Sequence, residues 1–274
     1  MVDRFLEIKG EKNLLDISPI ALRLGPFNIR WYAVLIALGI VIGVFMACKE
    51  AKKVGFALDA ILDFVVYTLP FWLLGARLYY VVFNLPYYLA NPAEIFAIWQ
   101  GGLAIYGGLL AGIICLFIFC KKRHLSFFKF LDILAPSVLL AQALGRWGNF
   151  INKEAYGSAT TKSFLHLALH LPSFIVEGMK IDNIYYQPTF LYEFLWNLLG
   201  LALILLLRHR KNFYREGEIF WQYVAWYAFG RFFIEGMRSD SLMIFAHQRI
   251  SQVLSFIFFC LAVVFVYFKR RKRV

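Results

Sequence analysis

Seven long apolar runs constrain this chain more than any other feature of its sequence. They lie at Trp31–Cys48, Ala60–Phe83, Gly101–Cys120, Leu131–Phe150, Pro188–Leu207, Ile219–Ile234 and Ile250–Phe268. A helix that crosses a bilayer needs roughly 20 mostly apolar residues. The 274 residues are 61% hydrophobic and only 17% charged, whereas soluble domains have about 25% charged residues. The sequence therefore predicts an all-α integral membrane protein of about seven transmembrane helices, with residues 1–274 forming a single polytopic domain.

The lysines and arginines between the runs predict the orientation of the chain. Basic clusters follow four of the runs, at Lys49–Lys53, Lys121–Arg123, Arg208–Arg215 and Lys269–Arg273. Residues 84–100 contain no basic residue, and the long loop 153–187 balances its lysines with acids. Because cytoplasmic connections carry the excess of Lys and Arg, we expect the N-terminus and loop 153–187 outside and the C-terminus in the cytoplasm. The basic residues between Arg4 and Arg30 are an exception to this pattern.

The sequence predicts neither a removable signal peptide nor a nucleic-acid partner. Residues 1–16 lack the apolar core and the cleavage site of a removable signal peptide, so the first run is expected to direct insertion. The net charge of +12 comes from the clusters at the ends of the runs. No basic face interleaved with stacking aromatic residues is present, so we expect no nucleic-acid partner.

Charged residues inside the apolar runs mark a candidate site. An Arg at the centre of a membrane helix costs about 2.5–3.5 kcal/mol on insertion scales, so such residues usually face a protein interior or a polar pathway. In the sixth run, Tyr227, Arg231 and Glu235 recur at helical spacing. Arg238 follows close to the same face. Residues at this spacing lie one above the other on a helix, so they form one polar stripe.

A second polar stripe lies in the fourth run. Arg146 and Asn149 share a helical face with Gln142. Where the helix leaves the bilayer, the stretch continues with Asn152, Glu154 and Gly157. Both stripes reach the outer leaflet, so we expect them to enclose one polar chamber there.

Two interpretations of these arginines remain open. Arg231 and Glu235 are spaced to form a structural ion pair that holds the bundle together. Arg146 has no carboxylate at helical spacing within the membrane, and its nearest acid, Glu154, lies two turns on. An unpaired guanidinium at the outer leaflet suits a phosphate ligand, because its fork of N–H groups matches phosphate oxygens.

Other polar positions give weaker signals. The glycine-rich stretch Gly101–Gly108 either brings backbone N–H groups near an anion at a helix start or allows close helix packing. Glu193 and Asn197 are predicted to form hydrogen bonds between helices. His166 and His170 have the spacing of zinc ligands but lack the Glu of a zinc-protease helix, so no metal site is expected.

The sequence resembles the prolipoprotein diacylglyceryl transferases of bacteria over nearly its whole length. The most specific segments are GGLAIYGG (Gly101–Gly108), GRWGNFINKEAYG (Gly145–Gly157), QPTFLYE (Gln187–Glu193) and GRFFIEGMRSDS (Gly230–Ser241). The resemblance implies a plasma-membrane enzyme whose active site faces the outer leaflet. It would transfer the diacylglyceryl group of phosphatidylglycerol to the lipobox cysteine thiol of a prolipoprotein and release glycerol 1-phosphate. It implies no metal or organic cofactor.

The same resemblance implies roles for individual residues. The essential arginines of the family correspond to Arg146 and Arg231, and Glu235 is expected to orient Arg231. Substrate-binding residues are expected at Tyr32, Gly102, Gly107, Asn149, Asn152, Glu154, Gly157, Tyr227 and Arg238. Many members have His where this sequence has Tyr106, a catalytic position in the family. A free Tyr has a pKa near 10 and is a poor base at neutral pH, so either the base lies elsewhere or the thiol needs none. We favour the second hypothesis, in which the arginines favour the thiolate and Tyr106 is a spectator.

Two other functions would use the same residues. In a transporter or flippase for an anionic lipid, the arginines would line a pathway, but paired halves with broken helices are not evident in the sequence. In a scaffold protein, they would form buried ion pairs, and neutral replacements at Arg146 would be tolerated.

Overall fold

The chain is predominantly helical and crosses a membrane several times. A computed structural model describes residues 18–271 apart from 25–26, 212, 240–242 and 245–247. Within these residues, six helices are long and apolar enough to span a bilayer. They are α1 (Trp31–Lys53), α2 (Leu58–Phe83), α4 (Ile105–Lys122), α5 (Phe127–Asn152), α7 (Thr189–Leu207) and α9 (Ile250–Arg271). The predicted class, a helical multi-pass membrane protein, is confirmed.

A further long helix, α8 (Glu218–Met237), covers the remaining predicted run. Its polar residues leave it outside the six candidate spans. By length and apolar composition, the described residues therefore support six spans, one fewer than the sequence predicted.

Some expectations from the sequence fall outside the described residues. One is the prediction that residues 1–16 contain no removable signal peptide. The others concern the basic residues Arg4, Lys9, Lys12, Lys272 and Arg273 and the motif residues Asp240 and Ser241.

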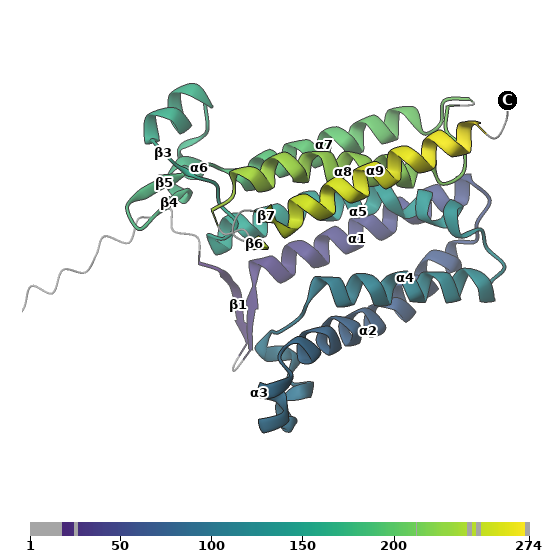
Figure 1. Cartoon of the computed structure of the whole chain (residues 1–274), viewed down its shortest axis with the longest axis horizontal. Helices are drawn as coiled ribbons and strands as arrows, with labels where there is room; N and C mark the ends of the chain where they lie inside the picture. Colours follow the sequence, from purple (N-terminus) through teal and green to yellow (C-terminus); the bar gives the residue numbers. More distant parts are fainter. Residues whose placement is uncertain (1–17, 25–26, 212, 240–242, 245–247, 272–274) are drawn as a thin grey trace, which may run out of the picture. The chain divides into compact units, whose positions relative to one another are not determined.

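The chain forms two compact units (Figure 1). The first comprises residues 1–41, 138–214 and 221–274, and the second comprises residues 42–137 and 215–220. In the second unit, α2 packs along α4 because glycines allow the two backbones to approach. A Cβ at Gly108 would lie 2.5 Å from the Trp72 ring, and a Cβ at Gly75 would lie 2.5 Å from Ala111. Of the two uses considered for the glycine-rich stretch, Gly108 shows close helix packing.

Short helices connect α2 to α4 in the second unit. They are α3 (Leu85–Ala90), η1 (Pro92–Phe96) and η2 (Ile98–Gln100). Aromatic rings fill the core of this unit, where Phe64 and Phe130 meet edge to face with their centroids 5.2 Å apart.

In the first unit, a reciprocal tryptophan pair fixes the register of α7 against α8. The rings of Trp196 and Trp226 stack with their centroids 4.2 Å apart. Each indole N–H donates to the backbone carbonyl of the other tryptophan at 2.9 Å. Gly200 and Gly230 make room, since a Cβ at either would lie within 2.4 Å of the facing ring. This register sets which polar residues of α7 and α8 face each other one turn further along.

The loop 153–187 contains a small three-stranded sheet of the first unit. Strands β3 (Ala159–Thr160), β4 (Lys180–Ile181) and β5 (Ile184–Tyr186) form an antiparallel sheet in the order β3-β5-β4. Asp182 and Asn183 have positive φ values of 48° and 65°, as a tight two-residue hairpin turn requires. Two further strand pairs are β1 (Ile20–Leu24) with β2 (Phe27–Arg30) and β6 (Met243–Ile244) with β7 (Gln248–Arg249).

The loop 153–187 also contains two short helical segments. Residues Phe164–Ala168 make a single π-helical turn, η3, and α6 spans Ser173–Gly178. Leu165 and Val176 are fully buried and pack with Phe190 in a small core of this loop. Apolar residues of both short helical segments therefore help to stabilise the fold of the loop.

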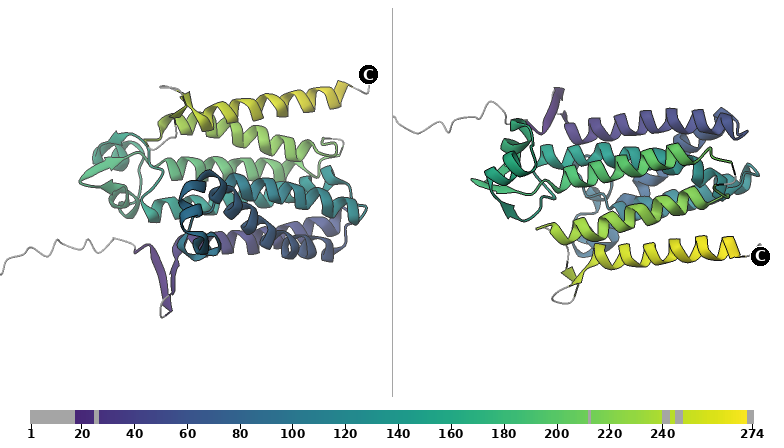
Figure 2. Two further views of the ribbon diagram at one scale, coloured as in Figure 1. Left: turned by 60° about the horizontal axis from the view of Figure 1, so that its bottom comes forward. Right: turned by 90° about the horizontal axis from the view of Figure 1, so that it is seen from above.

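The two ends of the helices in the first unit differ in character. The small sheet lies at the end where α5 finishes and α7 begins (Figure 2). The basic last turn of α9 lies at the opposite end of α7 (Figure 2). There, Arg270 Nη2 donates to the carbonyl of Phe213, which follows α7, at 3.2 Å.

Candidate active site

Charged side chains from three helices of the first unit meet around Glu193. This residue lies on α7 and is only 5% exposed. Its carboxylate oxygens lie 2.8 Å from Arg146 Nε on α5 and 2.7 Å from Arg231 Nη1 on α8. One carboxylate thus bridges the two arginines that the sequence singled out, and it joins the polar stripes of α5 and α8 at one site.

Arg231 is held from a second side by Glu235, one turn further along α8. Arg231 Nη2 lies 2.6 Å from Glu235 Oε2, and Arg238 Nε lies 4.0 Å from the same oxygen. Arg249, the last residue of β7, donates to the backbone carbonyl of Glu235. These cations lie at the C-terminal end of α8, where the helix dipole favours positive charge.

The end of α5 folds Glu154 back against the site. Lys153 has a φ of 53°, and the N–H groups of Lys153 and Glu154 donate to the carbonyls of Phe150 and Asn149 at 3.2 and 3.0 Å. This pair of bonds is the Schellman motif, which turns the chain at a helix end. As a result, Asn149 Nδ2 and Asn152 Nδ2 donate to Glu154 Oε1 at 3.0 and 3.3 Å.

Asn149 connects this turn to Arg146. Arg146 Nη1 donates to Asn149 Oδ1 at 3.3 Å, and Nη2 lies 3.5 Å from the hydroxyl oxygen of Tyr227 on α8. The Tyr227 hydroxyl accepts in this contact, so its own hydrogen can be donated to another group. Residues from α5, α7 and α8 therefore orient the Arg146 guanidinium.

Two glycines, Gly148 and Gly157, allow other parts of the chain to pack closely against the site region. A Cβ at Gly148 would lie 2.3 Å from the ring of Tyr32, so this ring rests directly on α5. Gly157 forms an isolated antiparallel bridge with Arg238, and a Cβ there would lie 2.9 Å from Gln187. The first unit thus holds Tyr32, Gly157 and Arg238 together with the arginine cluster.

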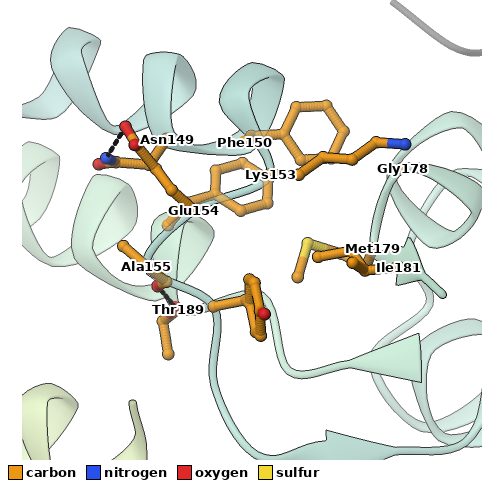
Figure 3. Close-up of a pocket in the computed structure, with 11 residues that line it drawn as sticks. Asn149, Phe150, Lys153, Glu154, Ala155, Gly178, Met179, Ile181 and Thr189 are labelled. Carbon is orange, nitrogen blue, oxygen red and sulfur yellow. Dashed lines mark hydrogen bonds between the residues drawn. The ribbon is translucent and has the colours of Figure 1, made fainter. Parts of the chain in front are cut away.

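A small pocket opens between the end of α5 and loop 153–187. Figure 3 shows the Glu154 side chain directed toward Asn149, whereas Lys153 extends toward Gly178. Met179 contributes an apolar wall. The pocket therefore borders the hydrogen-bonded turn that ends α5.

Arg146 is not the unpaired cation that the sequence predicted. That prediction considered carboxylates at helical spacing within one run, whereas the partner, Glu193, comes from α7. Glu193 was predicted only to form a hydrogen bond between helices. It is the single charged residue in α7, and a lone carboxylate in a membrane helix usually has a partner or a function. This signal in the sequence pointed to the missing residue.

Three predicted site residues, Gly102, Tyr106 and Gly107, belong to the second unit. Tyr106 lies in the first turn of α4 and is 49% exposed. The N–H of Gly107 donates to the Ala104 carbonyl at 3.1 Å, and a Cβ at Gly107 would lie 2.3 Å from the carbonyl oxygen of Gly75. These contacts favour close helix packing over anion binding as the use of Gly107.

Arg77 on α2 is a residue of the second unit whose importance the sequence hardly indicated. It is only 5% exposed. Its guanidinium donates to four backbone carbonyls between Glu94 and Gly102 at 2.6 to 3.0 Å. The guanidinium also lies 5.2 Å from the ring centroid of Tyr88. Arg77 therefore fixes the connection that leads into the glycine-rich stretch.

Loop 153–187 carries an ion pair outside the membrane-spanning helices. Lys162 Nζ lies 2.7 Å from Glu177 Oε1. The hydrogen bond from Lys162 lowers the pKa of Glu177, and the same bond raises the pKa of Lys162. Because the lysine side chain is 58% exposed, solvent screens the pair and it contributes little to stability.

The fold and the site define a class: an integral membrane protein with a cluster of paired arginines and carboxylates among its apolar helices. A family model for prolipoprotein diacylglyceryl transferase matches residues 19–268. The chain belongs to the prolipoprotein diacylglyceryl transferase family.

Several curated relatives named phosphatidylglycerol–prolipoprotein diacylglyceryl transferase are similar over almost their whole length. The protein from Enterococcus faecalis is 52% identical over 258 residues, which cover 94% of this chain and 92% of the relative. The protein from Limosilactobacillus reuteri is 51% identical over 94% of this chain and 93% of its own. The protein from Lactobacillus gasseri is 51% identical over 94% and 92%.

Proposed function

We propose that this chain transfers the diacylglyceryl group of phosphatidylglycerol to the lipobox cysteine thiol of prolipoproteins, at the outer leaflet of the bacterial plasma membrane. Membership of the family supports the reaction and both substrates. The observation that carries the proposal is the pair Arg146 and Arg231, brought together by Glu193 inside a bundle of apolar helices. Two guanidinium groups held side by side form a binding site for a phosphodiester.

The position of the pair along the helices supports a site at the outer leaflet. Arg146 lies six residues before the end of α5, or about 9 Å along the helix axis. Glu193 is in the second turn of α7, at the same end of the unit as the small sheet. The basic last turn of α9 lies at the opposite end. Because basic helix ends remain in the cytoplasm, the arginine pair faces the outer leaflet, and the C-terminus is cytoplasmic.

We also infer that α8 is a seventh membrane span, which places the N-terminus outside. Its 20 residues measure about 30 Å, the thickness of the hydrocarbon core. Trp226 of α8 stacks on Trp196 of α7, and both residues lie near the middle of their helices. The charged residues that lower its apolar character pair with Glu193 and with one another, so they do not face lipid.

In this function, the residues of the site bind the headgroup and stabilise the leaving group. Arg146 and Arg231 hold the phosphodiester, and the hydroxyl of Tyr227 donates to a headgroup oxygen. The positive field of the guanidinium groups lowers the pKa of the incoming thiol, which loses its proton to water. The thiolate then attacks the glyceryl carbon that bears the phosphate ester.

The bonds and charges of the transfer balance without a cofactor. A C–S bond forms while the C–O bond to phosphate breaks, and its electron pair stays on the phosphate oxygen. The leaving group is glycerol 1-phosphate, whose phosphate gains one negative charge. Guanidinium groups directed at this growing charge stabilise the transition state. Glu193 and Glu235 keep the Arg231 guanidinium in place during the reaction.

The test is transfer of labelled lipid from phosphatidylglycerol to a lipobox peptide by the purified protein. Wild type is expected to be active, whereas Arg146→Ala is expected to be inactive but folded. Arg123→Ala is a matched control, because Arg123 is an exposed arginine paired with Asp63. Absence of transfer by wild type, under conditions where the Enterococcus faecalis relative is active, would contradict the proposal and favour transport of an anionic lipid.

A further inference from the structure

A single buried carboxylate, that of Glu193, forms ion pairs with both arginines of the proposed phosphate site. The side chain of Glu193 is 6% exposed, and those of Arg146 and Arg231 are 19% and 15% exposed. Each carboxylate oxygen serves one arginine, at 2.8 Å and 2.7 Å. Among the described residues, Glu193 is the only carboxylate paired with Arg146. The two guanidinium groups therefore already share an anion that belongs to the protein.

A carboxylate at this position competes with phosphate in two ways. Carboxylate and phosphate oxygens use the same N–H groups of a guanidinium fork. In addition, a negative charge next to the site repels any anion that enters it, and this repulsion is strong where burial keeps solvent from screening it. Replacing the Glu193 carboxylate by a neutral group would therefore remove this partner from Arg146 and leave Arg231 paired with Glu235 alone, so that both cations attract phosphate more strongly.

The repulsion differs between substrate and product of the proposed reaction. The phosphodiester of phosphatidylglycerol carries one negative charge. The phosphate monoester of glycerol 1-phosphate carries about 1.5 to 2 negative charges at pH 7. Paired arginines without a competing anion would hold the product more tightly than the substrate, and release of the product would limit turnover.

We infer that Glu193 is the resident counter-anion of the phosphate site, which weakens the binding of phosphate groups and promotes release of the dianionic product. This role rests on the proposed function for the identity of that product. Glu193 is thus a positioning residue that acts at two stages. It forms ion pairs with Arg146 and Arg231, and it restores these pairs as glycerol phosphate leaves.

The decisive variant is Glu193→Gln, which preserves the shape of the side chain and removes its charge. Binding of glycerol 1-phosphate is measured by thermal stabilisation of the purified protein in detergent, which requires no turnover. We expect half-saturation of Glu193→Gln at a concentration at least about tenfold lower than for wild type. We expect a smaller gain for glycerophosphoglycerol, the singly charged deacylated headgroup. In the transfer assay, added glycerol 1-phosphate should inhibit Glu193→Gln at correspondingly lower concentrations.

Glu177→Gln is the matched control, because Glu177 is a carboxylate of the same unit that pairs with Lys162 in the outer loop. It should bind both phosphates like wild type. A folded Glu193→Gln with unchanged or weaker binding of glycerol 1-phosphate would overturn the inference, since a merely structural carboxylate predicts that result.

A second variant covers the case in which Glu193→Gln does not fold. Glu193→Asp keeps the charge but shortens the side chain by one methylene, so it cannot stay in contact with both arginines. Intermediate tightening of glycerol 1-phosphate binding is expected, and binding equal to that of wild type would overturn the inference.

The two proposals fail separately. If wild type shows no transfer but Glu193→Gln binds glycerol 1-phosphate more tightly, the proposed function is wrong, and the inference that Glu193 is a counter-anion still holds. If wild type transfers lipid and the variants bind phosphate like wild type, the counter-anion alone fails.

Discussion

At the scale of single residues, the site depends on the geometry of guanidinium groups. Arg146 directs separate nitrogens at a carboxylate, an amide oxygen and a phenol oxygen. Arg231 directs its two terminal nitrogens at Glu193 and Glu235. A lysine has one compact ammonium group and cannot reproduce such a planar fork. The same fork is what a phosphodiester would engage, so structural and functional demands on these arginines coincide.

Tyr106 tests how the thiol is activated. The residue is half exposed at the start of α4, with its ring 6.4 Å from that of Tyr79. In the proposed function, the positive field of the arginines favours the thiolate, and no proton transfer is assigned to the Tyr106 hydroxyl. Tyr106→Phe is therefore expected to keep the transfer rate within about threefold of wild type, because it removes only a weakly acidic hydroxyl.

The measurement is the rate of transfer to the lipobox peptide as a function of pH. A spectator Tyr106 predicts similar profiles for wild type and Tyr106→Phe. Loss of transfer in a folded Tyr106→Phe would show that the hydroxyl takes part in catalysis.

At the scale of helices and loops, the apolar runs predicted the positions of the elements well. Each long helix lies on a predicted run, and the ends differ by a few residues. Most helices extend into polar flanking residues, whereas α4 begins only at Ile105, four residues after the start of its predicted run. The small sheet in loop 153–187 could not be predicted, since its strands contain only two or three residues.

The site was only partly predictable, for a related reason. Spacing along one helix groups Tyr227, Arg231 and Glu235, but it says nothing about contacts between helices. The bridge from Glu193 to Arg146 depends on the register of α7 against its neighbours. That register comes from the stacked indoles of Trp196 and Trp226.

Gly148 offers a test of helix packing around the site. A Cβ at Gly148 would overlap the ring of Tyr32, whereas a Cβ at Gly145 would meet nothing within 4 Å. Gly148→Ala is expected to displace Tyr32 and to destabilise the protein by about 1–3 kcal/mol, as overpacking does. Gly145→Ala should leave the stability unchanged or raise it by up to about 1 kcal/mol, because Ala favours helix.

The comparison is made by thermal unfolding in detergent and by lipid transfer for both variants. If Tyr32 contacts the substrate, Gly148→Ala loses transfer while Gly145→Ala retains it. Equal behaviour of the two variants would contradict the contact between Tyr32 and α5.

Arg77 provides a test for the loop that leads into α4. Its four hydrogen bonds satisfy backbone carbonyl groups of η1 and of the two glycines that follow η2. Arg77→Met removes the donors and leaves buried acceptors, which predicts a loss of roughly 2–4 kcal/mol. Arg123→Met removes an exposed arginine, with its side chain 52% exposed, and should cost less than about 1 kcal/mol.

Hydrogen exchange locates the effect of Arg77→Met. Exchange in residues 91–104 is expected to rise in this variant, while exchange in residues 158–187 stays as in wild type. Uniform acceleration across the chain, or none at all, would contradict a local role for Arg77.

At the scale of the whole molecule, the proposed orientation in the membrane rests on the charge at the helix ends. The last turns of α1, α4 and α9 all carry lysine or arginine. The segment after α7 carries Arg208, Arg210 and Lys211. The proposed topology puts these ends in the cytoplasm, as the positive-inside rule favours. The chain can meet this requirement and keep loop 153–187 outside only if α8 crosses the membrane, since α8 follows the basic segment after α7 and precedes α9.

Cysteine labelling in intact cells tests this topology, in a variant whose four native cysteines are replaced by alanine. New cysteines are placed at Lys162 in the outer loop, at Lys211 after α7 and at Ser239 after α8, three exposed positions. A membrane-impermeant maleimide should label Lys162→Cys and Ser239→Cys in intact cells, and Lys211→Cys only after permeabilisation. Labelling of Lys211→Cys and Ser239→Cys from the same side would show that α8 does not cross the membrane. Reversal of the whole pattern would place the arginine pair at the inner leaflet, where a thiol of an exported precursor could not reach it.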